Sequence, residues 1–334
     1  MNILITGGAG FIGSHAVKLF LEQGHKVVVF DNLFRGFKEV IEVLSELGDL
    51  EFVEGDLRDL EAVRAVFKQY EIEAVLHFAA LCLVDESMRE PNLYFENNVG
   101  GSMNLLRAMT EAGVKNIIFS STSAVYNGFT AELPIKEETP ADPLNPYGDS
   151  KYMVERMIKW DSLADNFNYV IFRYFNVCGS SSDGLIGDSK KPSQLLMQNA
   201  VRGAMGIESF YYTYQEVETP DGSPIRDYID VEDLVEAHYK AYEYLVGGGK
   251  SEIFNLGNGK GYSTKEIVKA VEAEFGQELE KKEAEERRQG ENKAAYTDPS
   301  KAEQMLGWRA KKSLQDSIRS LRGWYTKRPN GWDY

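Results

Sequence analysis

The sequence is poor in cysteine, in basic residues and in long apolar runs. Its 334 residues include 2 cysteines, Cys82 and Cys178, which is too few for a disulfide framework or a cysteine-based metal site. Its longest apolar stretch, residues 74–84, is interrupted by His77 and is far shorter than the roughly 20 residues of a membrane-spanning helix. The N-terminus lacks the charged start and small-residue cleavage site of a secretion signal, so we expect a cytoplasmic protein.

Acidic residues outnumber lysine and arginine, 52 to 37, which gives a formal net charge of -15. A field of that sign repels polyanions, and the sequence has no basic run, so we expect no nucleic-acid partner. We also expect no metal site and no membrane partner. With 43% hydrophobic and 27% charged residues, the chain has the composition of a globular protein, and its length suggests about two domains.

Five apolar runs of strand length alternate with helical patterns in the first half of the chain. They cover residues 3–5, 27–30, 74–78, 116–120 and 170–174. Nearly continuous apolar strands that are separated by helices indicate a parallel sheet covered on both faces. We therefore predict a doubly wound, Rossmann-type α/β domain, followed by a smaller mixed α/β domain that holds the substrate.

The pattern loosens after about Asn176. We expect a short aromatic strand at 210–214 and helices around 265–275 and 301–306, the last capped by Asp298 with Pro299 at its first helical position. The charged segment 278–288 fits either a solvated helix or an exposed strand. We predict a first domain over 1–176, to which 226–250 return, and a second domain that takes up most of 177–334.

Gly7, Gly10 and Gly13 lie between the first strand and the first helix. Glycines there permit a tight turn and let backbone amides and the positive helix end approach a pyrophosphate, so this turn predicts a dinucleotide site. Asp31, at the end of the second strand, favours NAD because a carboxylate accepts hydrogen bonds from the ribose and repels a 2'-phosphate. Arg35 could accommodate a phosphate, which leaves NADP as an alternative. A purely structural glycine turn is the other reading.

The pair Asp56-Leu57 follows the apolar residues Phe52 and Val53. It stands where a third strand would end near the adenine, and it also fits a simple helix cap. The sequence alone leaves both readings open.

Tyr147 and Lys151 stand four residues apart at the start of a predicted helix over 146–160, which places them on one face. A phenol with a pKa of about 10 needs roughly 4 kcal/mol of help to act as a base at pH 7. A nearby ammonium lowers a pKa by about one to three units, and a positively charged nicotinamide ring would supply the remainder. Thr122, at the end of the fourth strand, is a candidate partner for a reacting hydroxyl. Two structural alternatives remain. Tyr147 and Lys151 could be an ordinary solvated pair on a helix, and Thr122 could belong to a Ser/Thr-rich strand end.

Taken together, these residues resemble the extended short-chain dehydrogenase/reductase family, and within it the UDP-glucose 4-epimerases. The resemblance runs nearly end to end, and several segments are far more specific than the glycine turn. The matching segments are 6–15, 31–33, 55–57, 77–80, 86–87, 97–99, 146–151, 173–176, 219–231, 254–257, 287–288 and 306–308.

The resemblance implies a tightly held NAD+ that takes a hydride from C4 of a UDP-sugar while Tyr147 removes the O4 proton, with Thr122 bridging the oxygen and the tyrosine. The 4-keto sugar then turns and receives the hydride on its other face. Lys151 would hold the nicotinamide ribose, and a homodimer formed through two helices of each subunit is implied. The implied substrate-binding residues are Thr122, Tyr147, Asn176, Gln194, Arg226, Arg288 and Glu291. The implied cofactor-binding residues are Gly7, Gly10, Phe11, Ile12, Gly13, Asp31, Asn32, Arg35, Gly36, Asp56, Leu57, Phe78, Ala79, Ala80, Asn97, Tyr147, Lys151 and Phe175.

The chain departs from the family pattern at several positions. Cys82 stands where the family has a lysine beside the cofactor, so a cation near the dinucleotide is missing. Thr213 falls where an aromatic ring stacks on uracil, and Tyr212 or Tyr214 would have to replace it. Ala295 occupies a position whose size is associated with N-acetylated sugars, which keeps UDP-N-acetylhexosamines and UDP-pentoses as alternatives.

Gln194 and Glu291 are each one methylene longer than the family's asparagine and aspartate at or near those positions. They keep the chemistry of the group and lengthen the arm that carries it.

Two other functions compete with epimerisation. A nucleotide-sugar dehydratase or decarboxylase needs an additional acid or base just after Thr122, where this chain has Ser123 and Ala124. A catalytically silent NAD-binding module predicts a damaged reactive group, yet Thr122, Tyr147 and Lys151 are all present. Both alternatives are therefore disfavoured.

Overall fold

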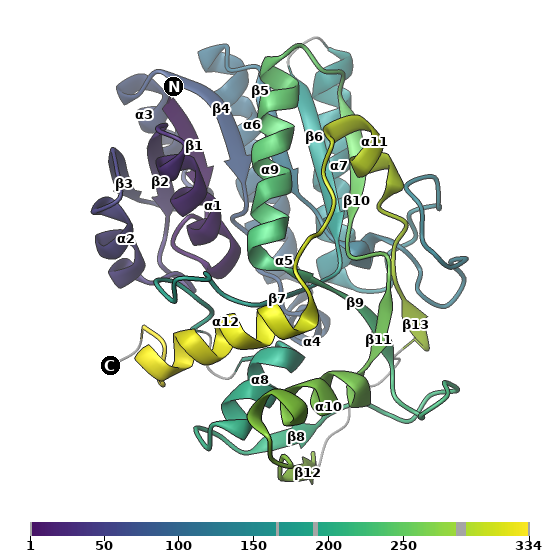
Figure 1. Ribbon diagram of the computed structural model, residues 1–334. Coiled ribbons are helices and arrows are strands. Elements are labelled where there is room, and N and C mark those ends of the chain that lie inside the picture. Colours follow the sequence, from purple (N-terminus) through teal and green to yellow (C-terminus); the bar gives the residue numbers. More distant parts are fainter. Residues whose placement is uncertain (1, 165–166, 190–192, 285–291, 333–334) are drawn as a thin grey trace.

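The computed structural model describes residues 2–164, 167–189, 193–284 and 292–332. Within these residues the central element is a seven-stranded sheet of parallel strands with helices on both faces (Figure 1), in the order β10-β6-β5-β4-β1-β2-β3. The predicted doubly wound α/β fold is thereby confirmed. The strands are β1 (Asn2–Thr6), β2 (Lys26–Asp31), β3 (Leu50–Glu54), β4 (Ile72–His77), β5 (Asn116–Ser120), β6 (Asn168–Tyr174) and β10 (Glu252–Leu256).

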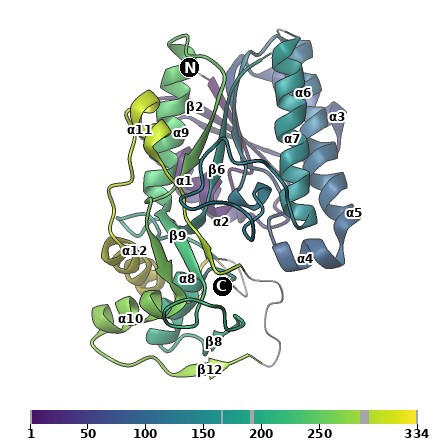
Figure 2. The same cartoon turned by 90° about the vertical axis from the view of Figure 1, so that its right-hand side faces the viewer.

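The two faces of the sheet are buried by different helices because successive strand residues point to opposite sides. Ile3 and Ile5 belong to one apolar cluster, whereas Leu4 belongs to the other. Figure 2 shows α9 on one side of the sheet and α6 and α7 on the other. The first cluster includes residues of α1 (Phe11–Glu22), α2 (Lys38–Ser45) and α9 (Val231–Val246); the second includes residues of α3 (Leu60–Gln69), α6 (Gly101–Ala112) and α7 (Pro146–Leu163).

Short helices connect β4 to α6 and follow β5. Between β4 and α6 lie α4 (Val84–Arg89), α5 (Pro91–Tyr94) and a π-helix (Phe95–Gly100). A 3-10 helix (Ser123–Val125) follows β5, and Thr122 caps it by accepting a hydrogen bond from the backbone N–H of Ala124. These segments lie at the carboxyl edge of the sheet, where open α/β folds bind ligands.

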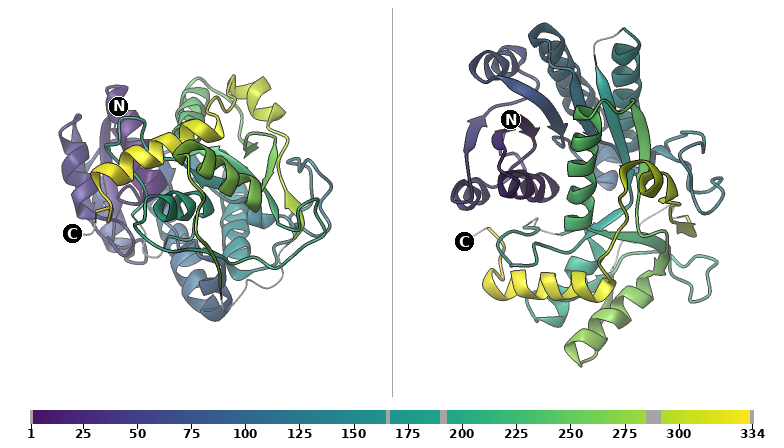
Figure 3. Two further views of the ribbon diagram at one scale, coloured as in Figure 1. Left: turned by 60° about the horizontal axis from the view of Figure 1, so that its bottom comes forward. Right: turned by 45° about the horizontal axis from the view of Figure 1, so that its top comes forward.

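Among its described residues, the second half of the chain also forms two small sheets with helices packed beside them. The strands β7 (Asn176–Cys178) and β13 (Ala294–Ala295) run parallel to β9 (Ile225–Asp230), and β11 (Gly261–Ser263) runs antiparallel to it. In the other sheet β8 (Phe210–Tyr212) pairs with β12 (Lys281–Glu283). Figure 3 shows α12 (Leu314–Lys327) lying beside α8 (Leu196–Ala204) and α10 (Thr264–Phe275).

The ambiguous segment 278–288 contains a strand at 281–283, and its residues from 285 onward lie outside the described part of the chain. The aromatic strand predicted at 210–214 is shorter than expected and ends at Tyr212.

Local signals set the helix starts. Asn145 accepts a hydrogen bond from Gly148 N at 2.9 Å, with Pro146 in the first turn, and α7 begins as predicted. The start of α11 (Ser300–Leu306) differs by one residue from our prediction. Pro299 is the capping residue rather than the first helical one, with a non-helical ψ of 6°, because the Asp298 carboxylate binds Ser300 N at 3.0 Å in a local turn.

The chain returns to the large sheet after its excursion into the second half. The helix α9 packs on α1, and β10 pairs with β6 at the sheet edge. The division into 1–176 with 226–250 and 177–334 stays a prediction. Among the described residues, no helix has the length and apolar character needed to span a membrane.

Buried neutral histidines connect the strands to the helices. His77 lies between Thr6 Oγ1, at 2.7 Å from Nδ1, and Ser102 Oγ, at 2.8 Å from Nε2. His238 Nε2 lies 2.8 Å from Ser120 Oγ. Burial lowers the pKa of His77 to about 3 and that of His238 to about 4. Both rings are therefore neutral in the folded protein at physiological pH.

We expect the free energy of unfolding to fall as the pH is lowered from about 6.5 toward 4. The unfolded chain takes up protons on these histidines near pH 6.5 and the folded chain only near pH 4 or below, so the stabilisation is complete above pH 6.5. For His238 the loss would reach about 3 kcal/mol. Urea unfolding between pH 4.5 and 7.5 measures it, and His238→Gln should flatten the slope by about one proton. An unchanged slope in that variant would contradict the assignment.

Candidate active site

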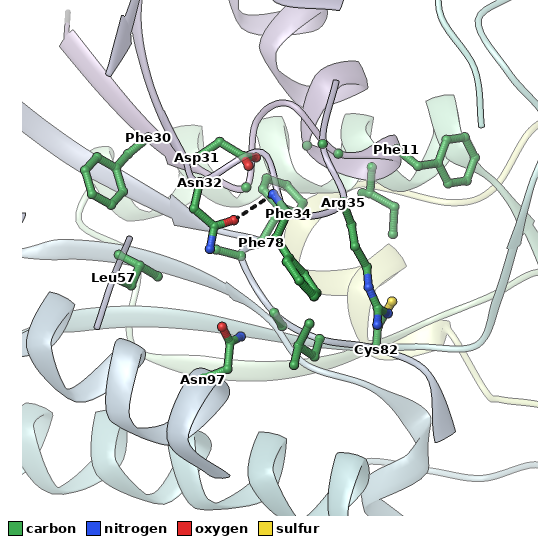
Figure 4. A pocket seen from close by; sticks show the side chains of 18 of the residues that line it. Phe11, Phe30, Asp31, Asn32, Phe34, Arg35, Leu57, Phe78, Cys82 and Asn97 are labelled. Atoms are coloured by element: carbon green, nitrogen blue, oxygen red, sulfur yellow. Dashed lines mark hydrogen bonds between the residues drawn. The ribbon is translucent and has the colours of Figure 1, made fainter. Parts of the chain in front are cut away.

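A cavity at the carboxyl edge of the large sheet gathers most of the residues singled out in the sequence (Figure 4). It is bounded by the turn after β1, the ends of β2, β3 and β4, the start of α7 and the end of β6. The predicted residues that line it are Gly7, Gly10, Phe11, Ile12, Gly13, Asp31, Asn32, Arg35, Gly36, Asp56, Leu57, Phe78, Ala79, Ala80, Asn97, Tyr147 and Lys151.

Phe175 is the predicted cofactor residue that does not line this cavity. Its side chain is buried in a separate apolar cluster with Val125, Tyr126 and Ile135, and Tyr174 lines the cavity instead. The reason is the alternation of side chains at the end of β6, which sends neighbouring residues to opposite sides.

Sequence reasoning also missed Phe30, Phe34, Gly55 and Leu81 as lining residues. They flank the predicted positions at strand ends, which is one sequence signal for them, and Gly55 also lies in the segment 55–57 that resembles the family.

Steric requirements fix the glycine turn. Gly7 has a φ of +75°, and a Cβ at this residue would lie 2.6 Å from the backbone nitrogen of Ala79. A Cβ at Gly13 would lie 2.1 Å from the carbonyl oxygen of Gly7. No side chain caps α1, whose capping residue is Gly10. The first-turn amides of α1 are thus presented to the cavity, which suits an anionic pyrophosphate.

The Asp31 carboxylate is oriented by the turn it faces. It accepts hydrogen bonds from Ala9 N at 3.0 Å and Leu33 N at 2.9 Å, and burial raises its pKa. In Figure 4 the Arg35 side chain runs away from Asp31 toward Cys82. Arg35 therefore does not provide a cation beside Asp31 for a 2'-phosphate, and the residues present fit NAD rather than NADP.

Asp56 lies beside Asn32 at the adenine end of the expected dinucleotide site. It accepts a hydrogen bond from Asn32 Nδ2 at 3.0 Å and pairs with the Arg58 guanidinium, whose hydrogen bonds lower the Asp56 pKa well below its usual range. Asp56 accepts from Asn32 and Arg58 and lines the cavity, and it is not the residue that caps the following helix. The cap of α3 is Asp59, which binds Glu61 N and Ala62 N.

Lys151 is a buried cation at the base of the cavity. Its Nζ donates a hydrogen bond to the Ser120 carbonyl oxygen at 2.7 Å and lies 4.7 Å from the centroid of the Phe119 ring. Burial lowers its pKa to about 8, so most of the ammonium remains protonated at pH 7. The end of β5 therefore positions the charge of Lys151 one helical turn from Tyr147.

Tyr147 is a protonated phenol in this environment. Burial raises its pKa well above the ordinary value, and a hydrogen bond with Thr122 acts in the opposite direction. The Thr122 oxygen already accepts from Ala124 N at 3.1 Å, so its hydroxyl proton is available to Tyr147. Tyr147 can act as a base only when additional positive charge lies close by.

A buried ion pair fixes these groups relative to one another. Arg173 Nη2 on β6 lies 2.5 Å from Glu155 Oε2 on α7, with side-chain exposures of 4% and 0%. Ser121 Oγ donates to the same carboxylate at 2.6 Å, and Arg173 Nη1 donates to the Tyr126 hydroxyl at 2.9 Å. Ser121 precedes Thr122, and Glu155 lies one turn beyond Lys151, so this pair aligns β5 with α7.

A second cavity lies beside the first. Its lining includes the predicted substrate residues Asn176, Gln194 and Arg226, and Arg226 Nη1 donates to the carbonyl oxygen of Ile225 at 2.9 Å. Tyr174 and Cys82 line the first cavity, while Asn176 and Asp85, only a few residues farther along, line the second. The two cavities are therefore neighbours. Arg288 and Glu291 lie outside the described residues.

Both candidate aromatic residues for the base-stacking role line the second cavity. Tyr212 and Tyr214 form an edge-to-face pair with ring centroids 5.3 Å apart, and Phe210 stands against Tyr212 in the same way. Thr213 lines the cavity as well. In the described part of the chain, no group of three or more His, Cys, Asp or Glu side chains is placed to hold a metal ion.

Comparison with known proteins identifies close relatives. The model of the NAD dependent epimerase/dehydratase family matches residues 3–257. A curated protein of Halalkalibacterium halodurans, named UDP-glucose 4-epimerase, is 41% identical and covers 99% of this chain and 98% of its own length. The crystal structure of UDP-glucose 4-epimerase from Bifidobacterium longum in complex with NAD+ and UDP is 36% identical, has a TM-score of 0.93, and covers 99% of this chain and 100% of its own.

A third relative is named for two sugars. The structure of the UDP-Glc/GlcNAc 4-epimerase from Campylobacter jejuni is 36% identical and covers 98% of this chain and 99% of its own, with a TM-score of 0.83.

We expect Glu155→Gln to destabilise the protein by about 3 kcal/mol, because it leaves the buried Arg173 guanidinium without its counterion. The double variant Glu155→Gln, Arg173→Met should be less destabilised than the sum of the single variants. Urea unfolding measures both. Glu111→Gln, which removes an exposed partner of Arg64, serves as the control and should leave the midpoint nearly unchanged. Strict additivity of the two buried substitutions would contradict the coupling.

Proposed function

This chain belongs to the NAD dependent epimerase/dehydratase family, and we propose that it interconverts UDP-glucose and UDP-galactose by inverting C4 of the sugar with bound NAD+. The observation that carries the proposal is that the cavity lined by the reactive tyrosine has a second cavity, lined by predicted UDP-sugar residues, as its neighbour. Tyr147 and Lys151 line the dinucleotide cavity, and Asn176 and Arg226 line its neighbour. A sugar attached to UDP in the second cavity would therefore present its ring to Tyr147.

The residues of this chain perform the proton chemistry. When bound, NAD+ would accept a hydride from C4 and later return it. Tyr147 takes the proton of the 4-hydroxyl as the C4–H bond breaks, and the C–O bond becomes a carbonyl. Once the 4-keto ring has turned over, Tyr147 returns its proton to the oxygen as the new C4–H bond forms on the other face. Thr122 donates toward the tyrosine oxygen and so lies where the substrate hydroxyl must approach.

Charge at the site controls when Tyr147 ionises. The burial of the phenol raises its pKa, so in the empty site a proton is retained. Lys151 remains cationic at pH 7 and favours the phenolate, and a positively charged ring in the cavity would favour it further. Tyr147 therefore becomes a base when the oxidised cofactor is bound beside it. Without the cofactor the phenol keeps its proton.

The sugar preference has a second candidate, UDP-N-acetylhexosamine. Ala295 on β13 pairs in register with Arg226 on β9, so a methyl group stands next to a residue that lines the substrate cavity. Ala295 itself packs against the apolar cluster of Val125, Tyr126 and Ile135, so it would act on the cavity through its neighbour Arg226. A dehydratase or decarboxylase is disfavoured because Ser123 and Ala124 place no carboxylate in the 3-10 helix after Thr122.

We also propose that the protein is a cytoplasmic homodimer. Met103 on α6 and Met153 and Trp160 on α7 are exposed by 56%, 39% and 67%. These helices lie side by side on the outside of the sheet (Figure 2), and apolar side chains gathered on one outer layer are typical of a protein interface. A second copy of the chain, packed through the same two helices, would cover them.

We expect the double variant Met103→Glu, Met153→Glu to dissociate the dimer, because carboxylates buried against a second copy are costly to desolvate. Sedimentation velocity at micromolar protein measures the change. Met305→Glu, at a methionine of 40% exposure on α11, is the control and should remain dimeric. A wild-type protein that sediments as a monomer at all concentrations would contradict the dimer.

Tyr147→Phe should lower kcat by about a hundredfold or more while the protein still binds NAD+, because only the transferable proton is removed. An NMR time course with UDP-glucose, UDP-N-acetylglucosamine and UDP-xylose measures turnover and distinguishes C4 epimers from products that have lost water or CO2. Tyr152→Phe, on the same helix, is the matched control and should retain activity. Unchanged turnover in Tyr147→Phe would overturn the proposed function. So would products that have lost water or CO2 when no C4 epimer is formed.

A further inference from the structure

A buried carboxylate lies on β9 between two residues of the second cavity. Arg226 and Tyr228 line that cavity, whereas Asp227 does not and is 0% exposed. The alternation of side chains along a strand explains this, because it sends Asp227 to the side opposite its two neighbours. Asp227 belongs to the segment 219–231 that resembles the family, and the proposed chemistry gives it no role.

The Asp227 carboxylate accepts three backbone hydrogen bonds from two distant segments. Its Oδ1 accepts from Asn258 N at 2.7 Å, and its Oδ2 accepts from Gly259 N at 3.1 Å and from Thr297 N at 3.3 Å. The first two donors belong to the loop between β10 and β11, and the third follows β13. Because β11 and β13 flank β9 on its two sides (Figure 1), one side chain holds both neighbours of this strand.

The fit around this carboxylate is close. A Cβ at Gly257 would lie 2.4 Å from Asp227 Oδ2, so glycine at this position lets the loop after β10 close around the carboxylate. A buried N–H group that loses its acceptor costs about 1 to 3 kcal/mol. Loss of the carboxylate would therefore release both segments from β9.

One of these segments also orients Arg226. Arg226 Nη1 donates to the carbonyl oxygen of Asn292 at 3.2 Å. Asn292 lies two residues before β13 and Thr297 two residues after it, so the bonds to Arg226 and to Asp227 hold the two ends of one short segment. A displacement of this segment would move the carbonyl group to which the guanidinium donates. The position of Arg226 in the cavity therefore depends on Asp227.

We propose that Asp227 is a positioning residue for the UDP-sugar, which acts through Arg226 on the diphosphate. This rests on the proposed function only in that the ligand carries UDP. A guanidinium binds a diphosphate through a planar pair of donors, and a side chain that is already oriented loses less conformational freedom on binding. Asp227 itself lines neither cavity. It fixes the orientation of Arg226 before the ligand binds.

The test compares the affinity for UDP with that for uridine, which lacks the diphosphate. Protein loaded with NAD+ is titrated with UDP by calorimetry and with uridine by ligand-detected NMR. Burial raises the pKa of Asp227 to about 7, so both titrations are made at pH 8, where the carboxylate is ionised.

Asp227→Asn should weaken UDP binding about tenfold and leave uridine binding within twofold of wild type, because an amide NH2 group would face backbone N–H donors and displace them. Gly257→Ala should change the two affinities in the same way, since its Cβ would push the Asp227 carboxylate out of place. In an Arg226→Ala background, Asp227→Asn should weaken UDP binding by less than twofold more.

A second buried carboxylate controls for general destabilisation. Asp233, on α9, is 3% exposed and accepts from Lys311 N and Lys312 N, each at 2.9 Å. It lines neither cavity. Asp233→Asn should lower the midpoint of thermal unfolding, as Asp227→Asn should, and leave the affinity for UDP within twofold of wild type. Both variants should retain NAD+, which confirms that the large sheet is folded.

Equal weakening of UDP and uridine binding in Asp227→Asn would overturn the proposal, because it would indicate a general structural role. Unchanged affinity for UDP would overturn it too, and so would a further tenfold loss when Asp227→Asn is added to Arg226→Ala. Failure of the proposed function is distinguishable from these results. A protein that binds UDP through the Asp227 carboxylate but epimerises no UDP-sugar would keep the positioning role and lose the activity. A protein that epimerises UDP-glucose and binds UDP equally well as Asp227→Asn would do the reverse.

Discussion

The buried pair of Glu155 and Arg173 is the constraint on which the geometry of the active site depends. Two charges removed from water cost several kcal/mol each, and the pair is stable because each guanidinium nitrogen and each carboxylate oxygen has a hydrogen-bond partner. Ser121 and Tyr126 supply those partners at 2.6 Å and 2.9 Å. Tyr126 in turn donates to Asn255 on β10 at 2.8 Å. One network therefore ties three strands and α7 together.

This network positions each reactive group. Thr122 follows Ser121, Asn176 stands three residues after Arg173, and Tyr147 and Lys151 lie on the two helical turns before Glu155. A slip of α7 by one residue would separate the Glu155 carboxylate from both hydroxyl and guanidinium. The ion pair thus sets the register between the helix that carries Tyr147 and the strand ends that face the substrate. In this role a buried pair matters because it fixes one arrangement, rather than because it adds net stability.

Sequence patterns revealed the parts of this fold that are local or periodic. Five of the seven strands of the large sheet were predictable because burial on both faces makes them apolar without a break, whereas the edge strands β3 and β10 were not among the predicted runs. Tyr147 and Lys151 were predictable because their spacing matches one helical turn. The contacts between distant segments were not predictable. Glu86 and Arg35 are 51 residues apart, and neither segment carries a sequence signal that indicates their contact.

Differences between expectation and structure at single residues had another origin. Phe175 and Tyr174 are neighbours at a strand end, where a shift of one residue exchanges the buried and cavity-facing sides. Pro299 was misplaced by one position because the turn at Asp298 competes with the first helical turn for the same amide. Sequence alone does not rank two local hydrogen bonds of similar strength, and tertiary packing decides between them.

A net charge of -15 is unfavourable for binding two anionic ligands, yet the charge of the whole chain differs from the charge close to the cavity. At physiological ionic strength, exposed charges farther away than about 8 Å are largely screened. Donors inside a cavity act at hydrogen-bonding distance in a medium of lower dielectric constant, where each interaction is stronger. Two acidic side chains near the cavity are also already paired, Glu86 with Arg35 and Asp56 with Arg58. We therefore expect the field at the ligand to be set by the turn amides and by Lys151, not by the sum over the chain.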